Sequence, residues 1–235
     1  MNVAVILAGG TGTRAGMEIP KQYYEVNGKA VISYCLHTFL THKKIDAVQI
    51  AADAMWHGYI MQQLRELPYN EKFRGFSSPG KNRQLSIYNS LTDIRGYASG
   101  NDMIVIHDAA RPCVSAIQIA DCVDAAKGHD GTLPVLPMKD TVYLSDDGRS
   151  VSSLLDRGNV FAGQAPEVFV LGKYYGANRA LLPDKILKIN GSTEPAVIAG
   201  MDIAMIPGDE INFKITTMAD LERFMEIVQK NKYSA

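Results

Sequence analysis

The sequence predicts a three-layer α/β fold built around a largely parallel sheet. Short apolar runs, typical of buried strands, alternate along its 235 residues with longer segments in which apolar residues recur every three or four positions. A glycine-rich loop follows the first apolar run at once. Strands that alternate with amphipathic helices favour a parallel sheet, because each crossover helix covers a face of the sheet.

The first half of the chain supplies most of these elements. We expect strands at residues 3–7, 47–52, 73–76, 103–107 and 131–135, and helices at residues 31–42, 55–67 and 83–94. A further helix begins after Ser115, a residue type that caps helix N-termini, and ends at Gly128. Ligands bind beyond the carboxyl ends of strands in such sheets. The loops that follow residues 7 and 107 should therefore face one cleft.

The pattern changes between residues 140 and 157. Two β-rich halves flank Asp147 and Gly148, and an Asp-Gly pair between such runs predicts a hairpin. An isolated hairpin is marginally stable in water, so we expect this β-arm to lean on a partner such as a second subunit. After it we expect a strand near Val160, a helix at about 173–182, strands at 202–206 and 211–215, and a last helix capped by Thr217 and Asp220. We interpret residues 1–235 as one domain.

Composition and charge restrict the classes of partner. The formal net charge of −1 argues against a broad nucleic-acid surface, which needs a basic excess. Cys35, Cys113 and Cys122 lack C-x-x-C spacing and look like reduced thiols. The apolar start lacks a basic region and is cut short by glycines, and no apolar run approaches the ~20 residues of a membrane helix. We expect a cytoplasmic protein without nucleic-acid or membrane partners.

The loop after the first strand has the composition of a polyphosphate site. It contains Gly9, Gly10, Gly12, Arg14 and Gly16, and Lys21 follows Pro20 at its end. Glycines let backbone N–H groups approach an anion closely, and the two cations answer its charge.

Two other interpretations of this loop compete with a triphosphate site. Gly10-x-Gly12-x-x-Ala15 also matches the dinucleotide fingerprint, but that site needs an acidic residue ~20 positions later, and residues 26–33 contain none. A tight turn with solvated cations is the other alternative. A Walker loop is excluded because its G-x-x-x-x-G-K-[ST] sequence is absent. A triphosphate best accounts for both Arg14 and Lys21, because it carries more charge than the pyrophosphate of a dinucleotide.

The segment from His107 to Pro112 places Asp108 at the end of a predicted buried strand. A carboxylate at a phosphate site is a natural Mg²⁺ ligand, because Mg²⁺ takes few carboxylates and completes its shell with phosphate oxygens and water. The alternative is a structural pair between Asp108 and Arg111 that shapes the turn.

Two weaker signals lie further along the chain. Gly80, Arg83 and Ser86 stand at the start of a predicted helix, where they suit either a base and phosphate contact or simple capping. Lys214 follows Asn212 and Phe213 on a predicted apolar strand and needs a counter-charge. A substrate phosphate or a position at the sheet edge would account for it.

Taken together, these segments resemble the cytidylyltransferases that act on small polyol phosphates. The matching segments occur in order over nearly the whole chain: LAGGTGTRAG…PKQY, the R-x-x-S of Arg83 and Ser86, HDAARP, Asp140-Thr141, Asp156-Arg157 and NFKIT. Two branches are similar, the methylerythritol-phosphate cytidylyltransferase of isoprenoid synthesis and the ribitol-phosphate cytidylyltransferase of cell-wall polymers.

The resemblance implies a Rossmann-like nucleotidyltransferase fold with a mostly parallel mixed sheet, and a homodimer clasped by a protruding β-arm at about residues 140–157. It implies that CTP and a polyol phosphate react, with Mg²⁺ as cofactor, to give a CDP-polyol and pyrophosphate. Carried onto this sequence, the catalytic residues are Arg14, Lys21 and Lys214. The nucleotide-binding residues are Leu7, Ala8, Gly9, Gly10, Gly12, Thr13, Gly80, Arg83, Ser86, Asp108 and Ala109. The polyol-phosphate residues are Arg111, Asp140, Arg157, Gln164, Thr193 and Lys214, and the metal ligands are Asp108 and Asn212.

Departures from the isoprenoid branch bear on the acceptor. Leu154 replaces a threonine, Gln164-Ala165-Pro166-Glu167 replaces a T-P-Q run, and Thr193-Glu194-Pro195-Ala196 replaces T-D-D/E-A-S. These changes lie where the polyol is expected. We therefore favour a ribitol 5-phosphate type of acceptor, with 2-C-methyl-D-erythritol 4-phosphate as the alternative. A non-catalytic nucleotide-binding protein and an NAD-dependent oxidoreductase are remote alternatives.

Overall fold

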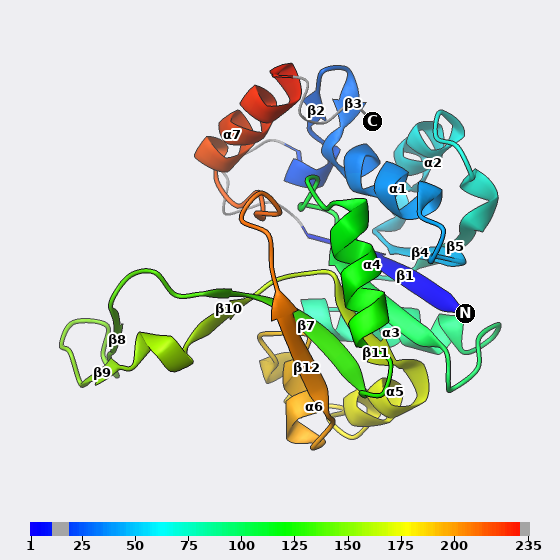
Figure 1. Cartoon of the computed structure of the whole chain (residues 1–235). Coiled ribbons are helices and arrows are strands. Elements are labelled where there is room, and N and C mark those ends of the chain that lie inside the picture. Colours follow the sequence, from blue (N-terminus) through cyan, green and yellow to red (C-terminus); the bar gives the residue numbers. More distant parts are fainter. Residues whose placement is uncertain (11–18, 231–235) are drawn as a thin grey trace.

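An eight-stranded mixed sheet forms the middle layer of the structure, a computed structural model that describes residues 1–10 and 19–230 (Figure 1). Its strand order is β10-β7-β11-β6-β1-β4-β5, with β12 paired to β7. The strands are β1 (Asn2–Leu7), β4 (Ala47–Ala51), β5 (Phe73–Ser77), β6 (Met103–Asp108), β7 (Gly131–Pro137), β10 (Phe161–Gly163), β11 (Glu167–Val170) and β12 (Ile203–Pro207). The predicted α/β class with a mostly parallel sheet is confirmed.

The direction of the strands decides which residues meet at the edge that carries the site. Strands β1, β4, β5 and β6 pair in parallel, and the register sets Leu7 beside Asp108. Strand β11 runs antiparallel to β6, with Glu167 opposite Ile106. The first residue of β11 consequently lies at the edge where β1 and β6 end.

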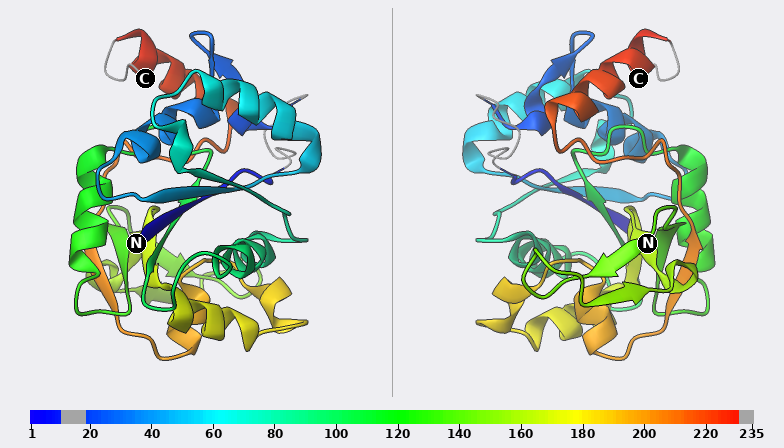
Figure 2. Two further views of the ribbon diagram at one scale, coloured as in Figure 1. Left: turned by 90° about the vertical axis from the view of Figure 1, so that its right-hand side faces the viewer. Right: turned by 90° about the vertical axis from the view of Figure 1, so that its left-hand side faces the viewer.

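Helices cover both faces of the sheet (Figure 2). Helices α1 (Val31–Thr41), α2 (His57–Arg65) and α4 (Ala116–Ala125) share one apolar core, and α3 (Arg83–Ile94), α5 (Leu171–Arg179) and α6 (Glu194–Ile198) contribute to the core on the other face. Helix α7 (Met218–Gln229) packs against α1 through Phe224 and Tyr34. Each fully buried apolar side chain contributes about 1.5–3 kcal/mol, so these cores hold the loops at the sheet edge in place.

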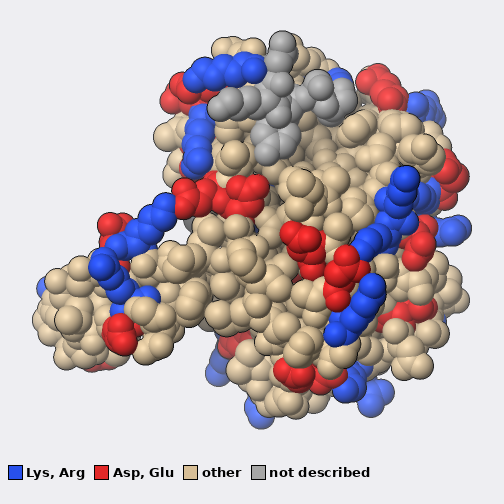
Figure 3. All heavy atoms as spheres, in the orientation of Figure 1, with Lys and Arg blue, Asp and Glu red and all other residues tan. Residues whose placement is uncertain are grey.

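The predicted β-arm is present as an antiparallel pair, β8 (Val142–Leu144) and β9 (Ser153–Leu155). Its turn is ordered by the carboxylate of Asp147, which accepts hydrogen bonds from the backbone N–H groups of Arg149 and Ser150. The arm stands away from the body, and uncharged residues cover most of its tip (Figure 3). Apolar side chains on it are exposed, Leu154 by 64% and Tyr143 by 59%.

One predicted strand is wrong. Residues 211–215 form no strand: the Asn212 N–H donates to the Asp209 carbonyl within a local turn, the Ile215 N–H donates to the Ala110 carbonyl, and no ladder forms. The sequence reasoning also missed β11 and the short hairpin of β2 (Glu25–Val26) and β3 (Lys29–Ala30). That hairpin turns through Asn27 and Gly28, both with positive φ, and an Asn-Gly pair is a known turn signal.

Smaller differences concern the ends of elements. The helix expected at residues 55–67 begins with a 3₁₀ turn at Ala54–Trp56 before α2, and Asp53 caps that turn. The caps at Ser115 and at Thr217 with Asp220 are present as predicted. No helix within residues 1–10 and 19–230 combines the length and the apolar character that a membrane crossing requires.

Candidate active site

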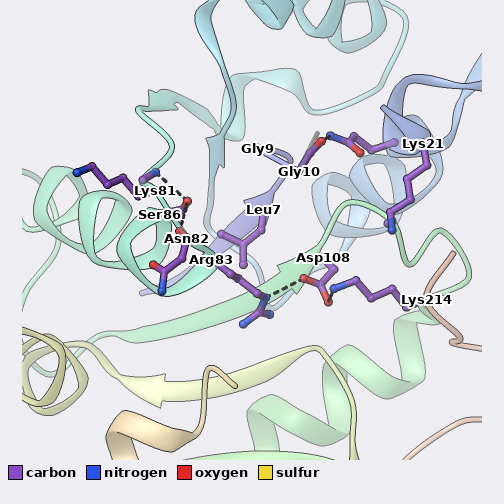
Figure 4. A pocket seen from close by; sticks show the side chains of 13 residues that line it. Leu7, Gly9, Gly10, Lys21, Lys81, Asn82, Arg83, Ser86, Asp108 and Lys214 are labelled. Atoms are coloured by element: carbon purple, nitrogen blue, oxygen red, sulfur yellow. Dashed lines mark hydrogen bonds and ion pairs between the residues drawn. The ribbon is translucent and has the colours of Figure 1, made fainter. Parts of the chain in front are cut away.

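A cavity of about 450 Å³ opens at the carboxyl ends of β1 and β6, and we call it the donor cavity (Figure 4). Its walls come from the glycine loop, the start of α3, the end of β6 and the segment before α7. The lining residues are Leu7, Gly9, Gly10, Lys21, Gln22, Gly80, Lys81, Asn82, Arg83, Ser86, Asp108, Ala110 and Lys214. The described start of the glycine loop, Gly9 and Gly10, and the segment after residue 107 thus face one cleft, as the sequence predicted.

The described start of the glycine loop is fixed by side chains that follow it. The Gln22 amide donates hydrogen bonds of 2.7 Å to the carbonyls of Ala8 and Gly10. A Cβ at Gly9 would lie 2.8 Å from the Cβ of Pro79, closer than carbon atoms pack. Gly9 therefore lets the loop approach the opposite wall of the cavity.

The wall beside α3 is both a helix cap and a binding surface. Asn82 caps the helix by accepting a hydrogen bond from the Leu85 N–H, and the Ser86 hydroxyl accepts one from the Gly80 N–H at 2.9 Å. A Cβ at Gly80 would lie 2.5 Å from the Cβ of Leu85. The position therefore requires glycine. Gly80 and Ser86 contribute to the local structure at the start of α3 and also line the donor cavity, so both interpretations of this segment hold.

Asp108 lies among three cations. Its Oδ1 is 3.1 Å from Nε of Arg83, and its Oδ2 is 3.1 Å from Nζ of Lys214 and 3.5 Å from Nε of Arg111. Burial raises the pKa of this carboxyl, but Arg83, Lys214 and Arg111 outweigh burial and hold it well below its ordinary value. The group is therefore ionised at any physiological pH. Figure 4 shows Arg83 and Lys214 meeting at Asp108, with Lys21 pointing toward the same carboxylate.

A second cavity of about 360 Å³, here called the acceptor cavity, adjoins the first. It shares Arg83, Asp108 and Lys214 with the donor cavity. Its other lining residues are Arg111, Leu133, Gly163, Gln164, Ala165, Glu167, Asn190, Gly191, Ser192, Thr193 and Glu194. The predicted polyol-phosphate residues Arg111, Gln164, Thr193 and Lys214 are therefore brought together around one space.

Several predicted site residues lie elsewhere. Ala8 and Ala109 are buried and line neither cavity, because their backbone groups are used inside the fold. Asn212 is fully buried and lines neither cavity, and its amide nitrogen donates to the Ala165 carbonyl while its Oδ1 accepts no hydrogen bond from the described residues. Its role as a metal ligand stays a prediction. Gly12, Thr13 and Arg14 fall outside the described residues.

Asp140 and Arg157 belong to the arm and not to either cavity of their own chain. Asp140 is exposed, and Arg157 donates a hydrogen bond of 2.9 Å from Nη1 to the Lys139 carbonyl. Conversely, the sequence reasoning missed Gln22, Asn82 and Glu167. Asn82, directly before a predicted helix, carried a capping signal that could have found it.

The described side chains provide a Mg²⁺ site only together with the oxygens of a bound phosphate. Among residues 1–10 and 19–230 no group of three or more His, Cys, Asp or Glu side chains is placed to hold a metal ion. The ionised Asp108 is the carboxylate in the described wall of the donor cavity. Mg²⁺ commonly binds through one or two carboxylates with phosphate oxygens and water, so one carboxylate beside a triphosphate site fits that ion.

A doubly wound α/β sheet with a cation-lined cavity at its carboxyl edge is typical of proteins that bind phosphate-bearing ligands such as nucleotides. The family profile described as "IspD: 2-C-methyl-D-erythritol 4-phosphate cytidylyltransferase" matches residues 2–230, so the chain belongs to the IspD family.

Relatives within this family carry two kinds of name. The bifunctional enzyme IspD/IspF of Paramagnetospirillum magneticum is 32% identical over 94% of this chain and 55% of its own length, so the chain spans about half of it. The ribitol-5-phosphate cytidylyltransferase of Vibrio parahaemolyticus is 31% identical over 97% of this chain and 96% of its own. The crystal structure of the Francisella tularensis 2-C-methyl-D-erythritol 4-phosphate cytidylyltransferase is 28% identical, with a TM-score of 0.79 over 95% of this chain and 97% of that one.

Proposed function

We propose that the protein is a Mg²⁺-dependent cytidylyltransferase that joins CTP to a small polyol phosphate, giving a CDP-polyol and pyrophosphate. One observation carries the proposal: two adjoining cavities share Arg83, Asp108 and Lys214. CTP in the donor cavity and a polyol phosphate in the acceptor cavity would meet at this shared cluster. The names of the relatives support the same reaction.

The chemistry follows from the charges at the junction. The acceptor phosphate is anionic at neutral pH, so one of its oxygens attacks the α-phosphorus of CTP without a strong base. The new P–O bond forms as the bond between the α-phosphorus and the bridging oxygen breaks, and pyrophosphate leaves with that oxygen. Lys21, Arg83 and Lys214 would offset the charge that grows on the phosphates, so catalysis is mainly positioning and electrostatic stabilisation.

Asp108 would hold the Mg²⁺ that arrives with the triphosphate, and the ion would supply charge neutralisation at the leaving pyrophosphate. For this, the carboxylate must exchange part of its contact with Lys214 or Arg83 for the metal. The released cations would then turn to phosphate oxygens, which offer them equal or greater charge.

Two polyol phosphates are candidates for the acceptor. Relatives that are 29% and 31% identical are named for 2-C-methyl-D-erythritol 4-phosphate and for ribitol 5-phosphate respectively, so the comparisons favour neither acceptor. We favour a ribitol 5-phosphate type because the departures from the isoprenoid branch at residues 164–167 and 193–196 lie in the lining of the acceptor cavity. The family profile supports methylerythritol phosphate as the second candidate.

We also propose a homodimer formed through the β-arm. Exposed Tyr143, Val151 and Leu154 give the arm an apolar surface that a second copy would bury. Arg157, which lines neither the donor nor the acceptor cavity of its own chain, would then serve the acceptor cavity of the partner. The buried, unpaired cysteines suit a reducing compartment, and we place the reaction in the cytoplasm.

A panel of pyrophosphate-release assays tests the proposed function. Four nucleoside triphosphates are combined with the phosphates of methylerythritol, ribitol, glycerol and a sugar, with Mg²⁺ and with EDTA. Release only with CTP, Mg²⁺ and a polyol phosphate would support the proposal. Tight CTP binding without release from any pair would instead favour a non-catalytic nucleotide-binding protein.

A further inference from the structure

We propose that Glu167 is a specificity-determining residue that restricts the acceptor to a monophosphate with an otherwise uncharged, hydroxyl-rich body. This inference rests on the proposed function and names the acceptor class for its second cavity. It concerns a residue that the sequence reasoning did not select.

The position of Glu167 is set by the sheet. Glu167 is the first residue of β11, which runs antiparallel to β6, and this direction brings its carboxylate to the edge where Asp108 ends β6. The residue is only 6% exposed, yet it lines the acceptor cavity. Burying a carboxylate costs free energy unless its oxygens are paired or hydrogen-bonded. The groups that contact Glu167 therefore show which oxygens remain able to accept a hydrogen bond from an acceptor.

Glu167 is held by two hydroxyls and a guanidinium. The Thr193 hydroxyl donates to Oε1 at 2.7 Å, and the Ser192 hydroxyl donates to Oε2. Nη2 of Arg83 lies 3.7 Å from Oε2. A carboxylate offers about four lone-pair positions, so capacity remains for a hydroxyl of the acceptor. It can only accept hydrogen bonds, and it therefore selects donors.

The same contacts fix the direction of Arg83. Its Nε pairs with Asp108 and its Nη2 faces Glu167, so the guanidinium is held between two carboxylates from neighbouring strands. Arg83 lines both cavities, and Arg111 and Lys214 accompany it in the acceptor cavity. This cavity thus combines cations for one phosphate with the carboxylates of Glu167 and Glu194 and with hydroxyls for a neutral body.

The charge of Glu167 also repels acceptors. A second phosphate or a carboxylate at the far end of the acceptor would lie beside the buried Glu167 carboxylate. Arg83, the cation near Glu167, also pairs with Asp108 and so does not fully offset this charge. Like charges in a site of low water content cost several kcal/mol, whereas a neutral hydroxyl at the same place gains a charge-assisted hydrogen bond.

A matched pair of acceptors tests this inference. Calorimetry with a non-hydrolysable CTP analogue present would measure the binding of ribitol 5-phosphate, 2-C-methyl-D-erythritol 4-phosphate and ribonate 5-phosphate, an acid analogue of ribitol phosphate. The proteins are wild type, Glu167→Gln, Glu167→Asp and a control, Glu226→Gln, at an exposed carboxylate on α7 that is paired with Lys230. Binding of the CTP analogue and the unfolding temperature are measured for each.

We expect wild type to bind a neutral polyol phosphate at least tenfold more tightly than ribonate 5-phosphate. Glu167→Gln should weaken polyol-phosphate binding by about 10- to 100-fold, the value of a hydrogen bond to a charged group, and reduce the preference over ribonate phosphate. Glu167→Asp should keep the preference while binding more weakly, because the charge remains but its reach is shorter. The control should behave as wild type.

Two results would overturn the inference. One is a wild type that does not prefer the neutral acceptors or binds none of them. The other is a Glu167→Gln variant that keeps the wild-type ratio, or loses both acceptors and CTP equally, as a merely structural residue would. The proposed function fails separately, if wild type binds the acceptors and CTP but releases no pyrophosphate. If Glu167→Gln does not fold, the wild-type preference for the neutral acceptors over ribonate 5-phosphate decides.

Discussion

The Oδ2 atom of Asp108 and the Nζ atom of Lys214 lie 3.1 Å apart, although the two residues come from the end of β6 and from the segment before α7. The pair lies where the donor and acceptor cavities join. Its lysine is thus held beside the proposed reacting phosphates but is neutralised by a carboxylate. A phosphate or a metal ion that competes for either partner would free the other.

Replacement of Lys214 tests this arrangement. Lys214→Met keeps the length of the side chain and removes its charge, so we expect turnover to fall about 10²- to 10³-fold, as when a transition-state donor is lost. The measurement is kcat with CTP and the best acceptor. Lys173→Met, at an exposed lysine of α5, is the control and should remain fully active. Unchanged turnover in Lys214→Met would exclude a catalytic charge at this position.

Lys21 faces the donor cavity from the end of the glycine loop. We expect Lys21→Ala to lose nearly all pyrophosphate release, about 10²- to 10³-fold, because a cation beside the triphosphate is removed. The fold should persist, which circular dichroism and thermal unfolding would check. Lys127→Ala, on the outer surface, is the matched control. Full activity in Lys21→Ala would mean that its assigned role is wrong.

Gly80→Ala tests the wall of the donor cavity. The new Cβ would lie 2.5 Å from Cβ of Leu85, so the turn must shift and the Gly80–Ser86 hydrogen bond is lost. We expect CTP binding to weaken about tenfold or more, since a hydrogen bond and the wall geometry change together. Gly58→Ala in α2, where nothing lies within 4 Å, should bind CTP normally. It should also be more stable by about 0.5–1 kcal/mol.

Stability should depend on pH through His107. Burial lowers the pKa of this imidazole to about 4, against about 6.5 in an unfolded chain. Below pH 6.5 the unfolded state binds a proton at this residue, whereas the folded state does not. The free energy of unfolding therefore falls as pH decreases to about 4, by at most about 1.4 kcal/mol per pH unit. Urea unfolding of wild type and His107→Gln between pH 4 and 7 measures this. Parallel curves would contradict it.

If the exposed β-arm forms the proposed homodimer, one negative charge on its apolar surface should prevent dimerisation. Leu154→Asp places a carboxylate on the apolar surface of the arm. Leu154 itself is 64% exposed in the single chain. We expect light scattering to give twice 25.7 kDa for wild type and 25.7 kDa for the variant. Ile117→Asp, on the exposed side of α4, should not change the mass. A monomeric wild type would contradict the proposal.

Local sequence patterns predicted many of the helices and their caps correctly. Helix α3 begins and ends at the predicted residues, and Ser115 and Thr217 cap helices as expected, because these elements depend on neighbouring residues. Residues 211–215 have the alternation of a strand but pair with no strand of the sheet. Strand β11 escaped prediction because its pairing with β6 and β7 is a contact between distant segments.

The sequence by itself determined the class of fold, the glycine loop, the arm and the presence of Asp108 and Lys214, because apolar periodicity and turn residues act over short distances. Only the tertiary structure decided that Arg83 faces both Asp108 and Glu167, that Asn212 is buried outside both cavities, and that the two cavities join. The physical reason is that strand order and direction, which no local pattern encodes, bring the start of β11 to the end of β6.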